Sequence, residues 1–369
     1  MKITCQKADL SNSVNIALKA VSSKTTMPIL ECIVIEVTDV IRFISNDMEL
    51  GIKTIVKGDI AERGKIAINA KIFADIIRKL PDNEVLIQTD EHFTMHITCE
   101  KAKFVISGKS SEEFPAIPQI EKAGALELSQ FTLKEVIRQT VFSISDNENN
   151  KIMTGELFEI SENVLRVVSL DGSRISIRKI ELEQTFPATK VIVPGKTLNE
   201  ISKILSGEVE EKIQIYFTDK HILFEFNDTL VLSRLIDGEY YRINQMLSGD
   251  YNTRFTVNKR ELQDCIDRAT LLLKESEKMP IIIGVKDSLM ELQMNTKIGS
   301  MDETIDIVKE GSDILIGFNP KFLLDALRVI DDEEVTLYMT NAKAPCFIKD
   351  KKESYIYLIL PVNFNAVAR

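Results

Sequence analysis

The chain has 369 residues, 44% of them hydrophobic and 28% charged, and its net charge is −10. This balance is typical of a folded globular protein and excludes a disordered chain, and no apolar run approaches the ~20 residues that cross a bilayer. The start Met1-Lys2-Ile3-Thr4 leads into a strand-like pattern and not into a signal peptide, so we expect a cytoplasmic protein. A negative chain is also a poor candidate for simple high-affinity nucleic-acid binding, so any contact with a polyanion must be local.

The first 125 residues predict two successive strand-helix-strands half-units. A strand at 2–6 and a helix at about 8–21 come first, and Met27-Pro28-Ile29-Leu30 restarts the strand pairing. Alternating runs then predict an antiparallel meander with strands at 31–37, 40–47 and 51–61. The second half-unit has an amphipathic helix within 66–80, followed by strands at 84–90, 93–100 and 101–108. Pro115, Pro118 and Gly124 mark a linker.

The stretch 66–80 returns at 191–205 and at 314–330, each time as a short strand, a turn or cap residue and an amphipathic helix. The strands around each copy repeat the order of the first 125 residues. We therefore predict three domains, at 1–125, 126–250 and 251–369. Because each domain holds two half-units of strands and a helix, the predicted fold class is α+β, with antiparallel sheets covered by helices.

The three helix copies carry cations at equivalent positions. Lys71, Lys196 and Lys321 are spaced by 125 residues, and the same spacing relates Arg78, Lys203 and Arg328. Positions i and i+7 share one face of a helix, and the apolar residues of the first copy are expected on the other face: Ile72, Phe73, Ile76, Ile77 and Leu80. Ordinary solvated surface charges would explain one such helix, but agreement in residue type and phase across three copies favours contact with a polyanion.

The cysteines and histidines predict no cofactor site. The five cysteines are scattered without a CxxC pair and are expected to be reduced and structural: Cys5, Cys32, Cys99, Cys265 and Cys346. His92 and His96 lie four apart in a strand-like run, which is a loose spacing for metal ligands. We therefore expect neither a metal ion nor another cofactor.

Several motifs in fixed order make the chain resemble the bacterial DNA sliding clamps, the beta subunit of DNA polymerase III. They are TTMPILECIVIEV, SGKSSEEFPAIP, SLDGSRISI, SRLIDGEYYRI and YLILPV, together with the threefold repeat. The resemblance covers essentially all 369 residues and implies three clamp domains that form half of a closed ring. It also implies a non-catalytic processivity factor: a head-to-tail homodimer that encircles duplex DNA without sequence preference and slides along it. A mildly basic lining within an acidic ring would suit sliding, since strong phosphate contacts would act as a brake.

The resemblance implies sites for DNA, for partner peptides and for the second subunit. The residues expected to contact DNA are Lys24, Lys71, Arg78, Asn147, Lys151, Lys196, Lys203, Lys321 and Arg328. Asn149 and Asn150 belong to the same loop as Asn147, which is equally well explained as a polar linker, and Arg138 and Arg268 are further candidates. A hydrophobic pocket would bind short motifs of the replicative polymerase, the clamp loader, and repair and translesion polymerases. Its expected residues are Leu170, Gly172, Arg174, Ile175, Tyr241, Gln245, Met246, Leu358, Ile359, Leu360, Pro361 and Val362. Phe104, Leu271 and Leu272 match subunit-contact positions, although Phe104 also fits a core position.

Without the resemblance, Asp171-Gly172 predicts a hairpin turn and 358–360 a strand, which Pro361 ends so that the segment's apolar side chains are free to form a wall. The chain departs from its relatives at Ser173, Tyr241, Gln245 and Asn363, where His, Pro, Arg and Arg are common, and in a tail after Phe364. These differences bear on which peptides bind best.

Two other classes of function make different demands on the sequence. An enzyme would rely on Asp47, Asp171 and Asp237, but no nucleophile or metal motif accompanies these carboxylates. A repeat scaffold that binds only proteins would make the six helix cations dispensable.

Overall fold

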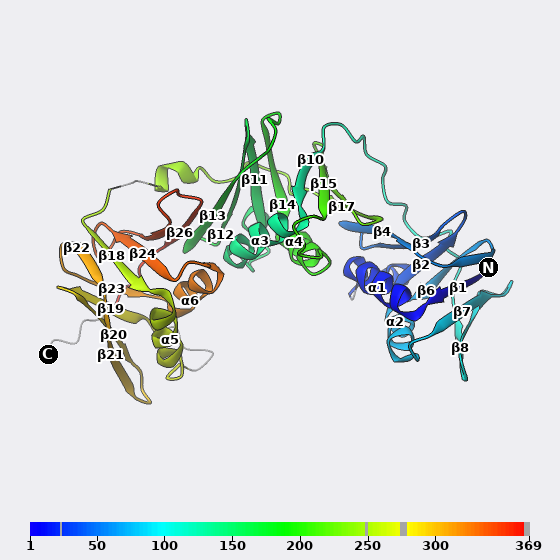
Figure 1. The fold of residues 1–369 in the computed structure, drawn as a ribbon, viewed down its shortest axis with the longest axis horizontal. Coiled ribbons are helices and arrows are strands. Elements are labelled where there is room, and N and C mark those ends of the chain that lie inside the picture. The colour runs from blue at the N-terminus through cyan, green and yellow to red at the C-terminus, as the bar shows by residue number, and fades with distance from the viewer. Residues whose placement is uncertain (23, 248–249, 274–278, 365–369) are drawn as a thin grey trace. The chain divides into compact units, whose positions relative to one another are not determined.

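The computed structural model describes residues 1–22, 24–247, 250–273 and 279–364 (Figure 1). The tail after Phe364 lies outside this range. The chain divides into two compact units, one formed by Met1–Thr132 with Asn199–Leu235 and the other by Leu133–Leu198 with Ile236–Arg369. Two of the three boundaries between them fall within α3 (Gln130–Thr140) and α4 (Gly195–Ser202), and the third follows Leu235.

The first unit contains two antiparallel sheets. The five-stranded sheet has the order β5 (Asp59–Glu62), β1 (Lys2–Gln6), β7 (Glu84–Thr89), β8 (Thr94–Cys99) and β9 (Ala102–Ser107). The eight-stranded sheet has the order β10 (Leu126–Ser129), β15 (Lys212–Phe217), β16 (His221–Phe226), β17 (Thr229–Arg234), β4 (Leu50–Val56), β3 (Ile41–Asn46), β2 (Cys32–Val37) and β6 (Gly64–Asn69).

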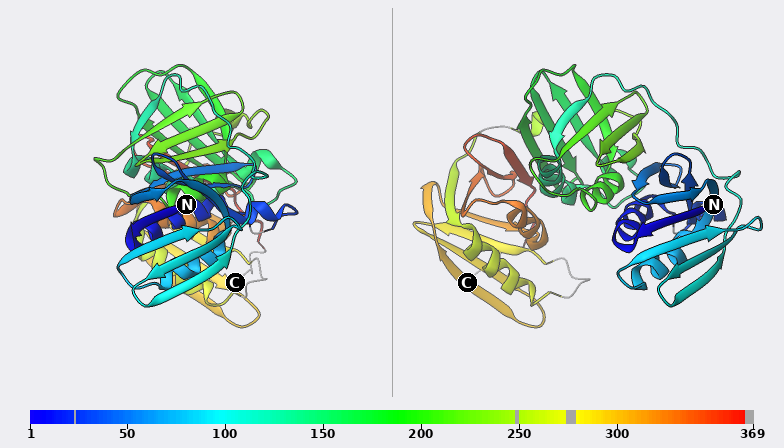
Figure 2. Two further views of the ribbon diagram at one scale, coloured as in Figure 1. Left: turned by 90° about the vertical axis from the view of Figure 1, so that its right-hand side faces the viewer. Right: turned by 45° about the vertical axis from the view of Figure 1, so that its right-hand side comes forward.

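Helices α1 (Lys7–Ala17) and α2 (Ala70–Lys79) lie side by side in this unit (Figures 1 and 2). Their apolar faces join strand residues such as Ile3 and Phe43 in one buried core. The prediction that residues 27–30 restart a strand was wrong, because η2 (Pro28–Glu31) is a 3₁₀ turn that begins with proline. Proline suits that place because its fixed φ matches a helical start and its missing N–H would be unpaired there.

The second unit also contains two antiparallel sheets. The nine-stranded sheet has the order β14 (Thr189–Pro194), β11 (Gly155–Ser161), β12 (Val164–Leu170), β13 (Arg174–Glu181), β26 (Tyr355–Ile359), β25 (Cys346–Lys349), β24 (Glu334–Met339), β18 (Thr253–Asn258) and β22 (Val308–Gly311). The four-stranded sheet has the order β21 (Ser300–Asp306), β20 (Leu289–Asn295), β19 (Ile281–Lys286) and β23 (Ile314–Phe318). Helices α5 (Lys259–Thr270) and α6 (Pro320–Val329) lie side by side and share one core with both sheets.

Successive repeats are joined by strand pairing. In the first unit β17 pairs with β4, and the buried hydroxyls of Thr54 and Thr229 meet at 2.8 Å across this seam. In the second unit β13 pairs with β26, with Ile175 opposite Leu358. The strand pairings among the described residues are antiparallel and helices pack on the sheets, so the predicted α+β class is confirmed.

The described part of the chain supplies two further facts. None of its helices has the length and apolar character of a membrane span. Within the same residues no three His, Cys, Asp or Glu side chains come together as metal ligands, and all five cysteines are buried thiols. Burial raises the pKa of the Cys5 thiol to about 12, so it stays protonated at neutral pH.

Candidate functional site

Each of the three repeated helices places an exposed lysine in its first turn. Lys71, Lys196 and Lys321 are the second residues of α2, α4 and α6. Two of these helices are capped by asparagine: Asn69 Oδ1 accepts from the amide of Ile72 (3.1 Å), and Asn319 Oδ1 accepts from that of Lys321 (3.0 Å). The helix dipole makes a positive charge at the N-terminal end of a helix unfavourable by about 0.3–1 kcal/mol. The helix dipole therefore does not explain why a lysine recurs at this position.

The second set of cations is exposed but partly neutralised. Arg78 donates to Asp75 (3.0 Å) and Lys203 to Glu200 (2.7 Å), each across one turn of helix. Arg328 donates to Asp267 of the neighbouring α5 (3.1 Å). Exposed ion pairs of this kind contribute little stability, roughly 0–1 kcal/mol, and can be exchanged for another anion.

One residue of the first copy was assigned to the wrong face. Ile72 is 52% exposed, next to Lys71, whereas Phe73 and Ile77 are buried. The buried stripe of α2 is narrower than the sequence pattern suggested, and Ile72 lies at its edge.

The loop before β11 is held by its own hydrogen bonds. Asn147 Oδ1 accepts from the amide of Asn149 (3.1 Å), and the Asn147 carbonyl accepts from the amide of Asn150 (3.1 Å). Lys151 then begins the 3₁₀ turn η4 (Lys151–Thr154), and its side chain is exposed, as is that of Lys24 in the first unit. Asn150 Nδ2 donates to the hydroxyl of Tyr241 (2.7 Å), so this loop is joined directly to the predicted peptide pocket.

The floor of the predicted peptide pocket is an apolar cluster on one face of the nine-stranded sheet. Leu170 at the end of β12, Ile175 on β13 and Leu358 on β26 are buried in it, together with Tyr240 and Ile243. The turn at Gly172 brings β12 back as β13, and its φ of +90° favours glycine. The floor therefore depends on pairing between β13 and β26, which are about 180 residues apart in sequence.

Exposed side chains form the rim. Met246, at the end of η5 (Ile243–Met246), is 53% exposed, and Tyr241 and Leu360 are each 39% exposed. Gln245 is exposed in the same turn. Apolar side chains left exposed beside an apolar floor are typical of a surface that binds peptides.

The segment after β26 leaves the ladder at Pro361. The Leu360 amide donates to the Ser173 carbonyl (2.9 Å), and the Val362 amide donates to the Gly317 carbonyl of β23 (2.8 Å). Pro361 between them has no N–H, as expected where strand pairing changes partner. Ile359, which we had assigned to the pocket, instead lies in the core on the other face of β26, because neighbouring side chains of a strand point to opposite faces.

Arg174 is buried and fully engaged within the protein. Its guanidinium donates to Asp171 (2.9 Å), Asp325 (2.6 Å) and the Phe142 carbonyl (2.6 Å), and it stacks on the Phe322 ring at 4.4 Å. These contacts join the β12–β13 turn to α6. Arg174 therefore supports the pocket by fixing the β12–β13 turn from inside the protein. No local sequence pattern identifies its partner Asp325, which lies 151 residues away.

The predicted subunit-contact residues are at the surface. Phe104 on the edge strand β9 is 39% exposed, so in this chain it is not a core residue. Leu271 at the end of α5 is 79% exposed, whereas Leu272 is half-buried and packs against the core of the third repeat.

Two of the three carboxylates of the enzyme hypothesis, Asp47 and Asp171, have structural partners. Asp47 Oδ1 accepts from the amide of Leu50 (2.7 Å), and Asp171 Oδ1 accepts from those of Ser173 (2.9 Å) and Arg174 (3.1 Å). Both side chains thus close turns between strands.

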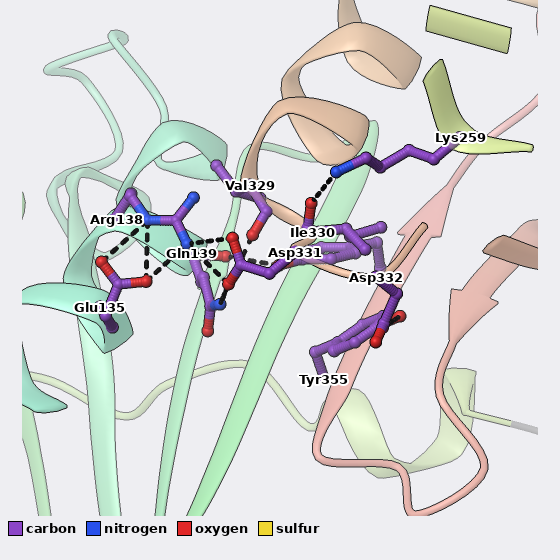
Figure 3. A network of polar contacts seen from close by, with 10 residues as sticks. Glu135, Arg138, Gln139, Lys259, Val329, Ile330, Asp331, Asp332 and Tyr355 are labelled. Atoms are coloured by element: carbon purple, nitrogen blue, oxygen red, sulfur yellow. Dashed lines mark hydrogen bonds and ion pairs between the residues drawn. The ribbon is translucent and has the colours of Figure 1, made fainter. Parts of the chain in front are cut away.

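Arg138 and Arg268, the further DNA candidates, are bound to carboxylates. Figure 3 shows Arg138 between Glu135 and Asp331, with Nη2–Oδ1 and Nη2–Oδ2 distances of 3.0 Å to Asp331. Hydrogen bonding to Glu135 raises the pKa of Arg138, and hydrogen bonding to Glu303 raises that of Arg268. The contacts of Arg138 join α3 of the second repeat to the end of α6 in the third.

Three family profiles match the chain in order. They are described as the N-terminal, central and C-terminal domains of the DNA polymerase III beta subunit and match residues 1–118, 127–241 and 244–363. Three tandem domains are thereby confirmed, whereas the boundaries drawn from the sequence stay a prediction.

Individual proteins of known name match over the full length. The beta sliding clamp of Bacillus subtilis is 35% identical over 378 aligned residues, which cover 98% of this chain and 99% of that protein. A crystal structure of a DNA polymerase III beta subunit from Eubacterium rectale is 63% identical, with a TM-score of 0.96 and coverage of 99% of this chain and 100% of that one. The Bacillus subtilis DNA polymerase sliding clamp has a TM-score of 0.94 at 34% identity, with the same coverage.

Proposed function

Because the chain belongs to the DNA polymerase III beta subunit family, the sliding clamps, we propose that two copies join head to tail as a ring that encircles duplex DNA. Its relatives are named as sliding clamps, which are non-catalytic processivity factors, and this chain is one as well. The ring tethers the replicative polymerase through the pocket between β12, β13, β26 and η5. The clamp loader and the repair and translesion polymerases use the same pocket.

The observation that carries DNA encirclement is the lysine in the first turn of α2, α4 and α6. The helix dipole disfavours a cation there, so the recurrence of a lysine at equivalent positions of three helices supports a shared role in contacting an anion. Helix N-termini also offer free N–H groups to phosphates. Arg78, Lys203 and Arg328 add weaker contacts, because each must release a carboxylate first. Weak and repeated contacts suit a protein that slides.

Two sheet edges support a head-to-tail dimer. β9 ends the five-stranded sheet and β21 ends the four-stranded sheet, so each has one side free of the strand pairings described here. β9 exposes Lys103, Phe104 and Val105, whereas β21 carries Asp302, Glu303 and Asp306. The basic and apolar β9 of one copy is complementary to the acidic β21 of the next. The Leu271–Leu272 pair lies close to β21, because Leu272 packs near Gly299, the residue before this strand.

The pocket is tested by Met246→Ala combined with Leu360→Ala. We expect these changes to weaken binding of the last ten residues of the replicative polymerase at least about tenfold, ~1.4 kcal/mol, because both rim side chains are lost. Fluorescence polarisation measures the affinity. The matched control is Leu289→Ala with Val308→Ala, which removes two exposed apolar side chains elsewhere in the third repeat. Equal affinity in both variants would contradict the pocket assignment.

A further inference from the structure

A further pocket lies on the same apolar cluster as the predicted peptide pocket. Its volume is about 200 Å³, and its apolar lining is Leu247, Phe347 and Ile356. These three residues belong to the same apolar cluster as Leu170 and Leu358, so one apolar cluster underlies both pockets. We call it the basic pocket, because its polar lining includes Arg166, Lys179 and Lys349.

Arg166 offers a donor that the described chain does not use. Its Nη1 donates to Glu159 (3.2 Å) and to Asn244 in η5 (2.9 Å). Its Nε–H is buried and finds no acceptor among the described residues. This nitrogen has almost no exposed surface, so a ligand reaches it only when the Arg166 side chain shifts. Because a buried donor without a partner is costly, an acceptor that then meets the Nε–H binds with a gain.

The basic pocket has an excess of positive charge. Lys179 and Lys349 share one carboxylate, that of Glu353, at Nζ–O distances of 3.8 and 2.6 Å. Lys349 holds the pKa of Glu353 below its usual range, so Glu353 is ionised at neutral pH. Arg166 pairs with Glu159, which leaves three cations facing two carboxylates in a chain whose net charge is −10.

We propose that the basic pocket binds an acidic side chain that flanks the apolar anchor of a partner peptide. This rests on the proposed peptide pocket, with which it shares its apolar cluster. The volume is below the ~300 Å³ at which pockets for drug-sized ligands begin, and it suits one side chain. The carboxylate accepts from Arg166 Nε–H and lies near Lys179 and Lys349, while its methylenes contact Phe347 and Ile356. Because Arg166 also bonds Asn244, occupancy of this pocket stabilises η5, which carries Met246.

The test compares peptides of the ten-residue polymerase tail extended by three Glu with peptides extended by three Gln. The extension is placed at the N-terminal end in one pair of peptides and at the C-terminal end in a second pair. Fluorescence polarisation with the full chain gives the ratio of the Gln-form Kd to the Glu-form Kd. The variant is Lys179→Ala with Lys349→Ala. The control is Lys351→Ala with Lys352→Ala, which removes the same charge from the exposed turn between β25 and β26.

We expect the Glu extension to tighten binding to the wild-type chain about two- to fivefold at one end of the peptide, the scale of a partly exposed ion pair. The control keeps this ratio and the Lys179/Lys349 variant brings it to one. If both peptides bind and the ratio is one in the wild-type chain, or falls equally in the control, the basic pocket is refuted and the peptide pocket stands. If neither form binds, the peptide pocket fails and this extension fails with it.

Discussion

A buried acid on β11 makes the stability of the second unit depend on pH. Glu156 is fully buried, and neither carboxylate oxygen has a hydrogen-bond partner among the described residues. The nearby Thr140 hydroxyl favours the ionised form only slightly, and it donates instead to the Val136 carbonyl (2.7 Å). Desolvation by burial therefore raises the pKa of Glu156 from 4.5 to about 8.

The sign and size of the effect follow from linkage. Between pH 4.5 and about 8 the native chain holds a proton on Glu156 that the unfolded chain releases. The contribution of Glu156 to the free energy of unfolding is then largest below pH 4.5 and falls by about 1.4 kcal/mol per pH unit as the pH rises through this window. From pH 5 to pH 7.5 the loss is about 3 kcal/mol.

Glu156→Gln removes the titration and keeps the shape. We expect the difference in the free energy of unfolding between the variant and the wild type to be about 3 kcal/mol more in favour of the variant at pH 7.5 than at pH 5. This corresponds to roughly 6–12 °C in the melting midpoint of this unit. Calorimetry at both pH values measures it, with Glu162→Gln in the exposed turn after β11 as the control. A difference between Glu156→Gln and wild type that is the same at pH 5 and pH 7.5 would refute the reasoning.

Three further changes test other parts of the structure. Arg174→Ala should lower the free energy of unfolding by about 3–5 kcal/mol in urea titrations, since Asp325 loses a buried partner; a loss below 1 kcal/mol would contradict this. Leu271→Asp should give a monomer in sedimentation velocity, while Leu289→Asp at another exposed site of the third repeat stays dimeric; a dimer in both would refute the interface. Alanine at all six helix cations should reduce polymerase processivity at physiological salt and leave the dimer intact. Unchanged processivity would exclude a DNA-contacting role. The six residues are Lys71, Arg78, Lys196, Lys203, Lys321 and Arg328.

The repeated helices could be predicted from sequence because their apolar spacing is local and recurs three times. Strand partners could not, since alternation reveals which face of a strand is buried and not which strand lies beside it. The pairings of β17 with β4 and of β13 with β26 join different repeats, and no local sequence pattern predicts them.

The candidate site stays a prediction, and the structure shows where its individual side chains lie. Leu358 and Ile359 are neighbours in sequence, yet only Leu358 is in the apolar cluster, because the register of β26 decides which face each side chain takes. Arg174 was assigned to the pocket, but its contacts with Asp325 and Phe322 depend on the folded position of α6. Arg166 drew no attention in the sequence, since its unused Nε–H follows only from burial.

The central claim is that the protein is linked to DNA by enclosing it. The direct measurement is retention on DNA after loading by the cognate clamp loader, on a nicked circle and on the same circle linearised, at a salt concentration that removes ordinary phosphate contacts. We predict retention on the circle and loss from the linear DNA, because a ring can leave only over an end. Equal loss from both would contradict encirclement and leave a scaffold that binds proteins alone.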